Sequence, residues 1–197
     1  MSNPAGPEPS HEEATITHVR ASLLRGLHKD MARRGGTAWE DLVDGLPPMG
    51  RETFREMPGS FAWLETARVN ELVMAHTALV GESGAVERIR STTDEQLTVI
   101  HAWLLKLLSP TTLIHQGPTL FRFNYRGGVV NLDDFQPGSA QLSIWALGMF
   151  PAWYTHSVPQ WLNRALELSG GGECSVAHQA PEEGYRHRYE LKWTSNR

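Results

Sequence analysis

The sequence has little of what secreted and membrane-spanning proteins need. Cys174 is its only cysteine, so no intramolecular disulfide can form, and this fits a reducing compartment. No apolar run approaches the ~20 residues of a membrane span. Residues 1–13 are rich in proline and glutamate and lack the apolar stretch of a signal peptide. We therefore expect a cytoplasmic protein with a disordered N-terminal tail over 1–13.

The chain also lacks a basic excess. Lys and Arg number 18 against 22 Asp and Glu, which gives a formal net charge of -4. General nucleic-acid binders normally carry a surplus of positive charge, so we expect no nucleic-acid partner. The remaining 14–197 are long enough for one sizeable core, and we interpret them as a single domain.

Motifs that carry catalysis or bind nucleotides are missing as well. The chain has no G-x-S-x-G nucleophile motif, no P-loop and no G-x-G-x-x-G fingerprint. Gly170-Gly171-Gly172 follows a predicted helix instead of opening one, so it does not resemble a phosphate-binding loop. We therefore predict a protein that is not an enzyme.

Apolar residues recur at helical spacing through 14–117, which we predict to be a helical half. The periodic segments cover 15–33, 39–46, 51–57, 61–80 and a long helix from Thr92 to about Leu108. Ser60 is the expected N-cap of the helix over 61–80. Thr92 and Glu95 have the spacing of a capping box, which favours a new helix start at Thr92.

The period changes from 3.6 to 2 in 118–193, which indicates a sheet. Alternating residues predict strands at 121–125, 129–133, 140–147, 173–179 and 185–193, with Gly127-Gly128 as a hairpin turn. A helix over 158–169, with Ser157 and Gln160 as its capping box, interrupts them. The fold class is thus α+β, with helices packed on a five-stranded antiparallel sheet in the order β-β-β-α-β-β. Regular pairing of the last hairpin would place Val176 opposite Tyr189, and His178 opposite His187.

Several positions of this module carry a resemblance to known proteins. They are Gly127-Gly128, Gly148, Trp161-Leu162, Gly170-Gly171 and the closing Tyr189-Glu190-Leu191-Lys192-Trp193. The pattern resembles a myxobacterial family of uncharacterised proteins of about this length. More distantly, it is similar to the vinyl-reductase-like and haem–nitric-oxide-binding group of α+β domains. The resemblance implies a ligand-binding fold and a non-catalytic sensor or adaptor, and a haem-type relative would need an axial histidine on a buried helix face.

The histidines are the candidate ligand and metal residues. His178 and His187 would lie side by side and could form a hydrogen-bonded pair, a pH-sensitive pair, or two ligands of a metal. Cys174 would lie about 13 Å from His178 along an extended strand, too far to share that metal, so we predict no metal site. His101 and His76 fall on predicted helices, where each is either a haem ligand or a polar residue beside the core.

An aromatic segment, Met149–Tyr154, lies between a predicted strand and helix. It could fill the core, form the mouth of an apolar pocket, or bind a partner through Met149, Phe150, Trp153 and Tyr154. The leading hypothesis is a non-catalytic signalling or scaffold protein that acts through protein–protein contacts, including as a homodimer, without a cofactor. The alternative is a sensor domain that binds a small apolar ligand or haem.

Overall fold

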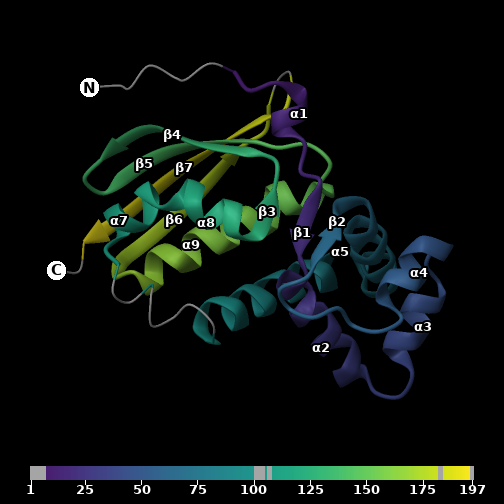
Figure 1. Ribbon diagram of the computed structural model, residues 1–197. Coiled ribbons are helices and arrows are strands. Elements are labelled where there is room, and N and C mark those ends of the chain that lie inside the picture. The colour runs from purple at the N-terminus through teal and green to yellow at the C-terminus, as the bar shows by residue number, and fades with distance from the viewer. Residues whose placement is uncertain (1–7, 100–104, 106–107, 182–183, 196–197) are drawn as a thin grey trace.

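A four-stranded antiparallel sheet and a group of helices make up the two ends of the molecule (Figure 1). The computed structural model describes residues 8–99, 105, 108–181 and 184–195. The sheet has the order β4-β5-β7-β6. Its strands are β4 (Val129–Gln136), β5 (Ser139–Trp145), β6 (Gly171–Gln179) and β7 (Arg186–Ser195).

Two helices cover one face of this sheet. They are α8 (Gly117–Asn124) and α9 (Val158–Leu168), and a π-helical turn, η2 (Trp153–Ser157), leads into α9 (Figure 1). The short helix α7 (Pro110–His115) precedes α8, and α1 (His11–Ala14) lies near the N-terminus. Tyr189 and Leu191 of β7 are fully buried on the covered face, as their alternation predicts.

The other end of the molecule is helical. It contains η1 (Ala21–Leu24), α2 (Arg25–Arg34), α3 (Ala38–Asp44), α4 (Pro48–Phe54) and the long α5 (Thr66–Val99). A small sheet in the order β2-β1-β3 joins the two ends, with β1 (His18–Arg20), β2 (Trp63–Glu65) and β3 (Tyr125–Arg126). One continuous cluster of buried apolar side chains runs through both ends, so the two halves share a core.

The predicted five-stranded sheet is wrong, because 121–124 are helical. Pro118 lies in the first turn of α8, where its missing N–H is tolerated. Phe121 and Tyr125 stack at 4.7 Å between ring centroids, as residues four apart on a helix can. Phe121, Phe123 and Tyr125 alternate as they would on one face of a strand, but Phe121 and Tyr125 are also four residues apart, as on one face of a helix. The alternation alone therefore does not distinguish a strand from a helix here. The described part of the chain has seven strands in two sheets of three and four.

The closing hairpin forms in a register shifted by two residues from the predicted one. Val176 pairs with Leu191, and His178 pairs with Tyr189. The shift by an even number leaves each side chain on its predicted face of the sheet. An irregularity between Gly171 and Cys174 lengthens the β6 side of the ladder, which an assumption of regular pairing misses.

Three predicted helix starts are also wrong. The segment over 15–33 is interrupted by strand β1, and α5 begins at Thr66 because 63–65 pair with that strand. Thr92 caps nothing. It lies inside α5, where it packs so closely on Gly26 of α2 that a Cβ at that glycine would overlap its hydroxyl. Ser157 makes no capping bond, since η2 continues directly into α9.

Gly127 offers a test of how the two sheets are connected. Its φ is +79°, and a Cβ there would overlap the carbonyl oxygen of Thr15. Gly127→Ala should lower the free energy of unfolding by at least about 2 kcal/mol, since it adds both backbone strain and a clash. Urea denaturation measures this loss. Gly59→Ala is the matched control, because the added Cβ meets nothing within 4 Å there. Equal stability of the two variants would contradict the description of this junction.

Candidate functional site

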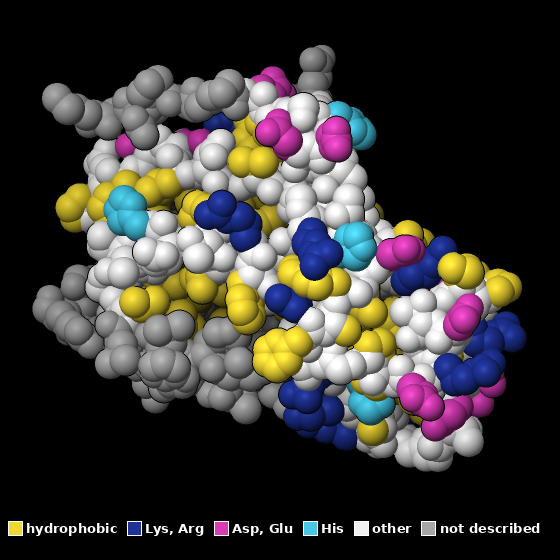
Figure 2. Space-filling model, viewed as in Figure 1, with side chains coloured by type: hydrophobic (Ala, Val, Ile, Leu, Met, Phe, Trp, Pro, Cys, Tyr) yellow, Lys and Arg dark blue, Asp and Glu magenta, His cyan; other side chains and the backbone are white. Residues whose placement is uncertain are grey.

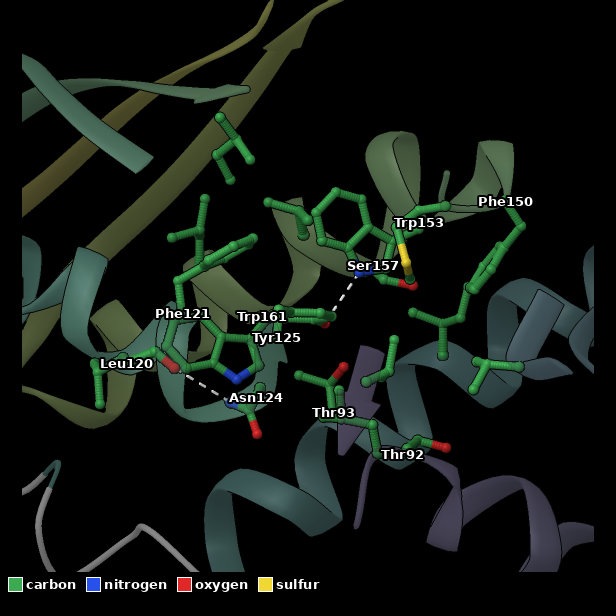
Figure 3. Close-up of a pocket in the computed structure, with 18 of the residues that line it drawn as sticks. Thr92, Thr93, Leu120, Phe121, Asn124, Tyr125, Phe150, Trp153, Ser157 and Trp161 are labelled. Carbon is green, nitrogen blue, oxygen red and sulfur yellow. Dashed lines mark hydrogen bonds between the residues drawn. The ribbon is translucent and has the colours of Figure 1, made fainter. Parts of the chain in front are cut away.

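A cavity of about 150 Å³ lies between α5, α8, η2, α9 and the inner face of the sheet. Figure 3 shows its aromatic side chains facing two threonines of α5 across the space. The lining is mostly apolar and includes Val19, Leu23, Leu24, Val69, Val73, Arg88, Ile89, Thr92, Thr93, Gly117, Leu120, Phe121, Asn124, Tyr125, Val130, Leu142, Ile144, Met149, Phe150, Trp153, Ser157, Val158, Trp161 and Leu162.

Three aromatic rings form one wall of this cavity. Trp153 donates a hydrogen bond from Nε1 to the Tyr125 hydroxyl at 3.0 Å, which Figure 3 draws as a dashed line. The two rings meet edge to face at 5.5 Å, and Phe121 stacks on Tyr125. Burial raises the pKa of Tyr125 to about 12, although the bond from Trp153 acts in the opposite direction. The phenol is therefore neutral at physiological pH.

The sheet and the segment after β5 supply aliphatic walls. Leu142 and Ile144 alternate along β5, so both point to the covered face and into the cavity. Met149 and Phe150 approach from the next segment. Aliphatic and aromatic walls of this kind bind apolar molecules through the hydrophobic effect and dispersion.

A polar wall faces the aromatic rings. Arg88, Thr92 and Thr93 of α5 line the cavity, and both threonines are buried. Residues four apart on a helix share a face, which aligns Arg88 with Thr92. The cavity therefore has a polar side as well as apolar sides.

The predicted histidine pair forms outside this cavity. His178 Nε2 and His187 Nδ1 lie 3.0 Å apart, and the His187 ring stacks on Tyr154 at 4.0 Å. Burial lowers the pKa of both imidazoles. That of His187 falls to about 4, because repulsion by His178 adds to burial. Among the residues that the structure describes, no three His, Cys, Asp or Glu side chains form a metal-binding group.

The other predicted ligands lie elsewhere. His76 is fully buried on α5, its Nε2 is 3.2 Å from Asp30 Oδ2, and its Nδ1 has no partner in the described part of the chain. It does not line the cavity. His101 falls outside the described residues. Burial raises the pKa of the half-buried Cys174 thiol, which disfavours the reactive thiolate.

The four predicted partner-binding residues are divided between the cavity and the histidine pair. Met149, Phe150 and Trp153 line the cavity, and Trp153 is 3% exposed. Tyr154 packs on His187 and accepts a hydrogen bond at its carbonyl from Tyr189. Of the three alternatives for this segment, the structure favours a wall of an apolar pocket. Binding of a partner through these residues stays a prediction.

Sequence reasoning did not identify the polar wall. Arg88 was not singled out, and Thr92 was interpreted as a helix cap. A signal was present, because Arg88 and Thr92 have i, i+4 spacing beside the apolar Ile89. Only the fold shows that this face meets a cavity instead of solvent.

Comparison with known proteins supports part of the predicted resemblance. No family model and no curated protein matches the chain. Solved structures of H-NOX (haem–nitric-oxide-binding) proteins do match it. The Fe(II) unliganded H-NOX protein from K. algicida has a TM-score of 0.67 and 9% identity over 90% of this chain and 97% of its own. The H-NOX protein from S. oneidensis, in the Fe(II)NO state, has a TM-score of 0.63 and 9% identity over 89% and 99%.

These likenesses define a class of fold. The chain has the α+β architecture of H-NOX domains. The predicted membership of a myxobacterial family finds no support in the comparisons. Sequence identity of 9% carries no ligand over to this chain, so the lining residues have to decide what the cavity binds.

The described lining does not fit a haem. Haem iron in proteins takes a histidine, cysteine, methionine or tyrosine ligand. Of the lining residues, none is a histidine or cysteine, and the neutral Tyr125 hydroxyl is bonded to Trp153. Met149 also lines the cavity, but methionine binds haem iron together with a histidine, and no histidine is among these residues.

On the face shown in Figure 2, acidic and basic side chains are mixed over the helical end and form no single-sign patch. None of the described helices is long and apolar enough to cross a membrane.

The histidine pair predicts a defined pH dependence. The pKa of His187 is near 4 in the folded protein against an ordinary 6.5, so the unfolded chain binds more protons between these values. Stability should be complete above pH 6.5 and decrease as the pH falls towards 4. His187→Phe keeps an aromatic ring against Tyr154 but cannot take a proton, so its melting temperature should fall less between pH 7.5 and 4.5.

His156→Gln is the control for this experiment. His156 is exposed on η2, two residues after the Tyr154 that stacks on His187, and its replacement should leave the difference between wild type and His187→Phe unchanged. Identical pH profiles of wild type and His187→Phe would show that the pair does not titrate as described.

Proposed function

We propose that this protein is a ligand-binding sensor domain that takes a small apolar molecule into the cavity between α5 and the sheet. The observation that carries the proposal is the cavity itself, with aromatic and aliphatic walls in the core of an H-NOX-like fold. Protein interiors are normally close-packed, so a space of this size with so many large side chains around it calls for an occupant.

The size and polarity of the cavity restrict this occupant. An apolar cavity of about 150 Å³ lined by Leu, Ile and Phe is known to stay dry and to bind benzene or xenon. The present cavity has a similar volume, with Leu142, Ile144 and Phe121 in its walls. Burying apolar surface stabilises by about 25 cal/mol per Å², enough to hold a single ring. We expect a ligand of about one ring.

Haem is the second candidate, because the solved neighbours contain it. One of these structures, with a TM-score of 0.56, concerns the modulation of heme redox potential through protein-induced porphyrin distortion. When bound, haem would supply an iron that binds gases. The described lining offers no histidine for that iron, and His101 is the one predicted axial candidate whose position the structure does not describe.

Protein–protein signalling is compatible with ligand binding and would follow it. A sensor needs an output, and partner proteins, including a second copy in a homodimer, would receive the ligand state. The missing catalytic motifs support this signalling role, because they indicate a protein that is not an enzyme. The aromatic segment contributes more directly to ligand binding, since three of its side chains line the cavity.

Toluene binding tests the proposal. Toluene at ten times its Kd should raise the melting temperature by about 3–6 °C, as mass action requires for a ligand of the folded state. Ile144→Phe places a ring in the cavity and should remove most of this shift. Far-UV circular dichroism and the melting temperature without toluene establish that the variant folds. A wild-type protein that shows no shift with toluene or other one-ring compounds would contradict the proposal.

Haem is tested separately by the absorption spectrum of protein purified after haem supplementation. We expect no stoichiometric Soret band. A stoichiometric band that is lost in His101→Ala and retained in His76→Ala would instead establish haem, with His101 as its ligand.

A further inference from the structure

The polar wall of the cavity contains a buried charged donor. Arg88 Nε is buried and has no hydrogen-bond partner within the described part of the chain. Thr92 and Thr93, on the same wall, are both more than nine-tenths buried. Buried donors are rarely left unsatisfied, and a charged donor still less often, so Arg88 points to an acceptor that the described residues do not supply.

Nearby acidic groups do not satisfy Arg88. Burial lowers the pKa of Arg88, and the negative charge of Asp30 acts in the opposite direction. The Asp30 carboxylate already accepts bonds from Arg34 and His76 and forms no ion pair with Arg88. A guanidinium stays protonated even when buried, so the cavity wall carries a positive charge.

We propose that Arg88 and Thr93 bind the carboxylate of a small aromatic carboxylic acid whose ring lies among Phe121 and Trp153. This rests on the proposed function, and it names the ligand class. A guanidinium and the Thr93 hydroxyl match the oxygens of a carboxylate, and the planar fork of arginine suits both of these oxygens. The opposite wall offers ring faces and edges at which a flat ring stacks.

The geometry of the cavity favours one ring and one charge. Figure 3 shows Thr92 and Thr93 on the side of the cavity opposite Trp153 and Phe150, so the two ends of a ligand would meet different chemistry. The volume of about 150 Å³ suits one ring. A cationic ligand would be repelled by Arg88, and a neutral one would leave it unpaired.

Benzoate and benzamide are the probes, because they have nearly the same shape and differ in charge. Isothermal titration of the full chain should give a dissociation constant for benzoate about 10- to 100-fold lower than that for benzamide. A difference of this size is the usual contribution of a hydrogen bond to a charged group. Arg88→Met should weaken benzoate by the same factor and leave toluene unchanged. Thr93→Val, which keeps the shape, should weaken benzoate about 3- to 10-fold.

Arg90→Met is the matched control. Arg90 belongs to the same helix, is exposed, and pairs with Glu87 at 3.8 Å outside this cavity. Its replacement should leave benzoate binding unchanged. This separates a specific contact with Arg88 from the general effect of removing one positive charge from α5.

The outcomes distinguish the two proposals. Toluene binding without preference for benzoate over benzamide would overturn the carboxylate assignment and leave the apolar-ligand function standing. Failure of toluene, benzamide and benzoate alike would overturn both. If Arg88→Met does not fold, the wild-type ratio of benzoate to benzamide affinity decides the question, with Thr93→Val as the second variant.

Discussion

The hydrogen bond from Trp153 to Tyr125 connects parts of the chain that are otherwise separate. Tyr125 begins β3, which pairs with β1 of the small sheet, and Trp153 begins the η2–α9 segment that covers the large sheet. The bond therefore fixes the helical end of the molecule against the sheet end. It also explains the cavity, because two large rigid rings locked edge to face hold the walls apart and cannot collapse into the space.

Much of the fold could be predicted from the sequence, wherever the apolar residues followed a single period, either 3.6 for a helix or 2 for a strand. The strict alternation after Tyr185 placed Tyr189 and Leu191 on the buried face, and the helix over 158–169 is α9. Prediction failed where two periods coincide, as at Phe121 and Tyr125, and where the turn between β6 and β7 set a register two residues from the predicted one. The first error concerns information that is not local. Only packing of the aromatic pair against Trp153, from a distant segment, decides that 121–124 are helical.

The candidate site was only half visible in the sequence. Its apolar half was visible, because Met149–Tyr154 is a conspicuous aromatic run and the mouth of an apolar pocket was one of its three interpretations. Its polar half was not, because an arginine on a helix is usually solvated and a Thr-x-x-Glu pattern usually caps a helix. Gly26 gives the physical reason. It lets α2 approach α5 so closely that Thr92 becomes buried, and no local pattern around Thr92 reports this.

The fold shared with H-NOX proteins and the lining of this cavity carry different kinds of information. A TM-score of 0.67 at 9% identity shows that the same architecture forms with almost none of the same side chains. Ligand specificity depends on those side chains, so it can change while the space between helices and sheet is retained. In this chain the space is small, one wall is aromatic, and the facing wall has a buried Arg88 Nε without a hydrogen-bond partner among the described residues. That combination favours a compact anionic ring over an iron porphyrin.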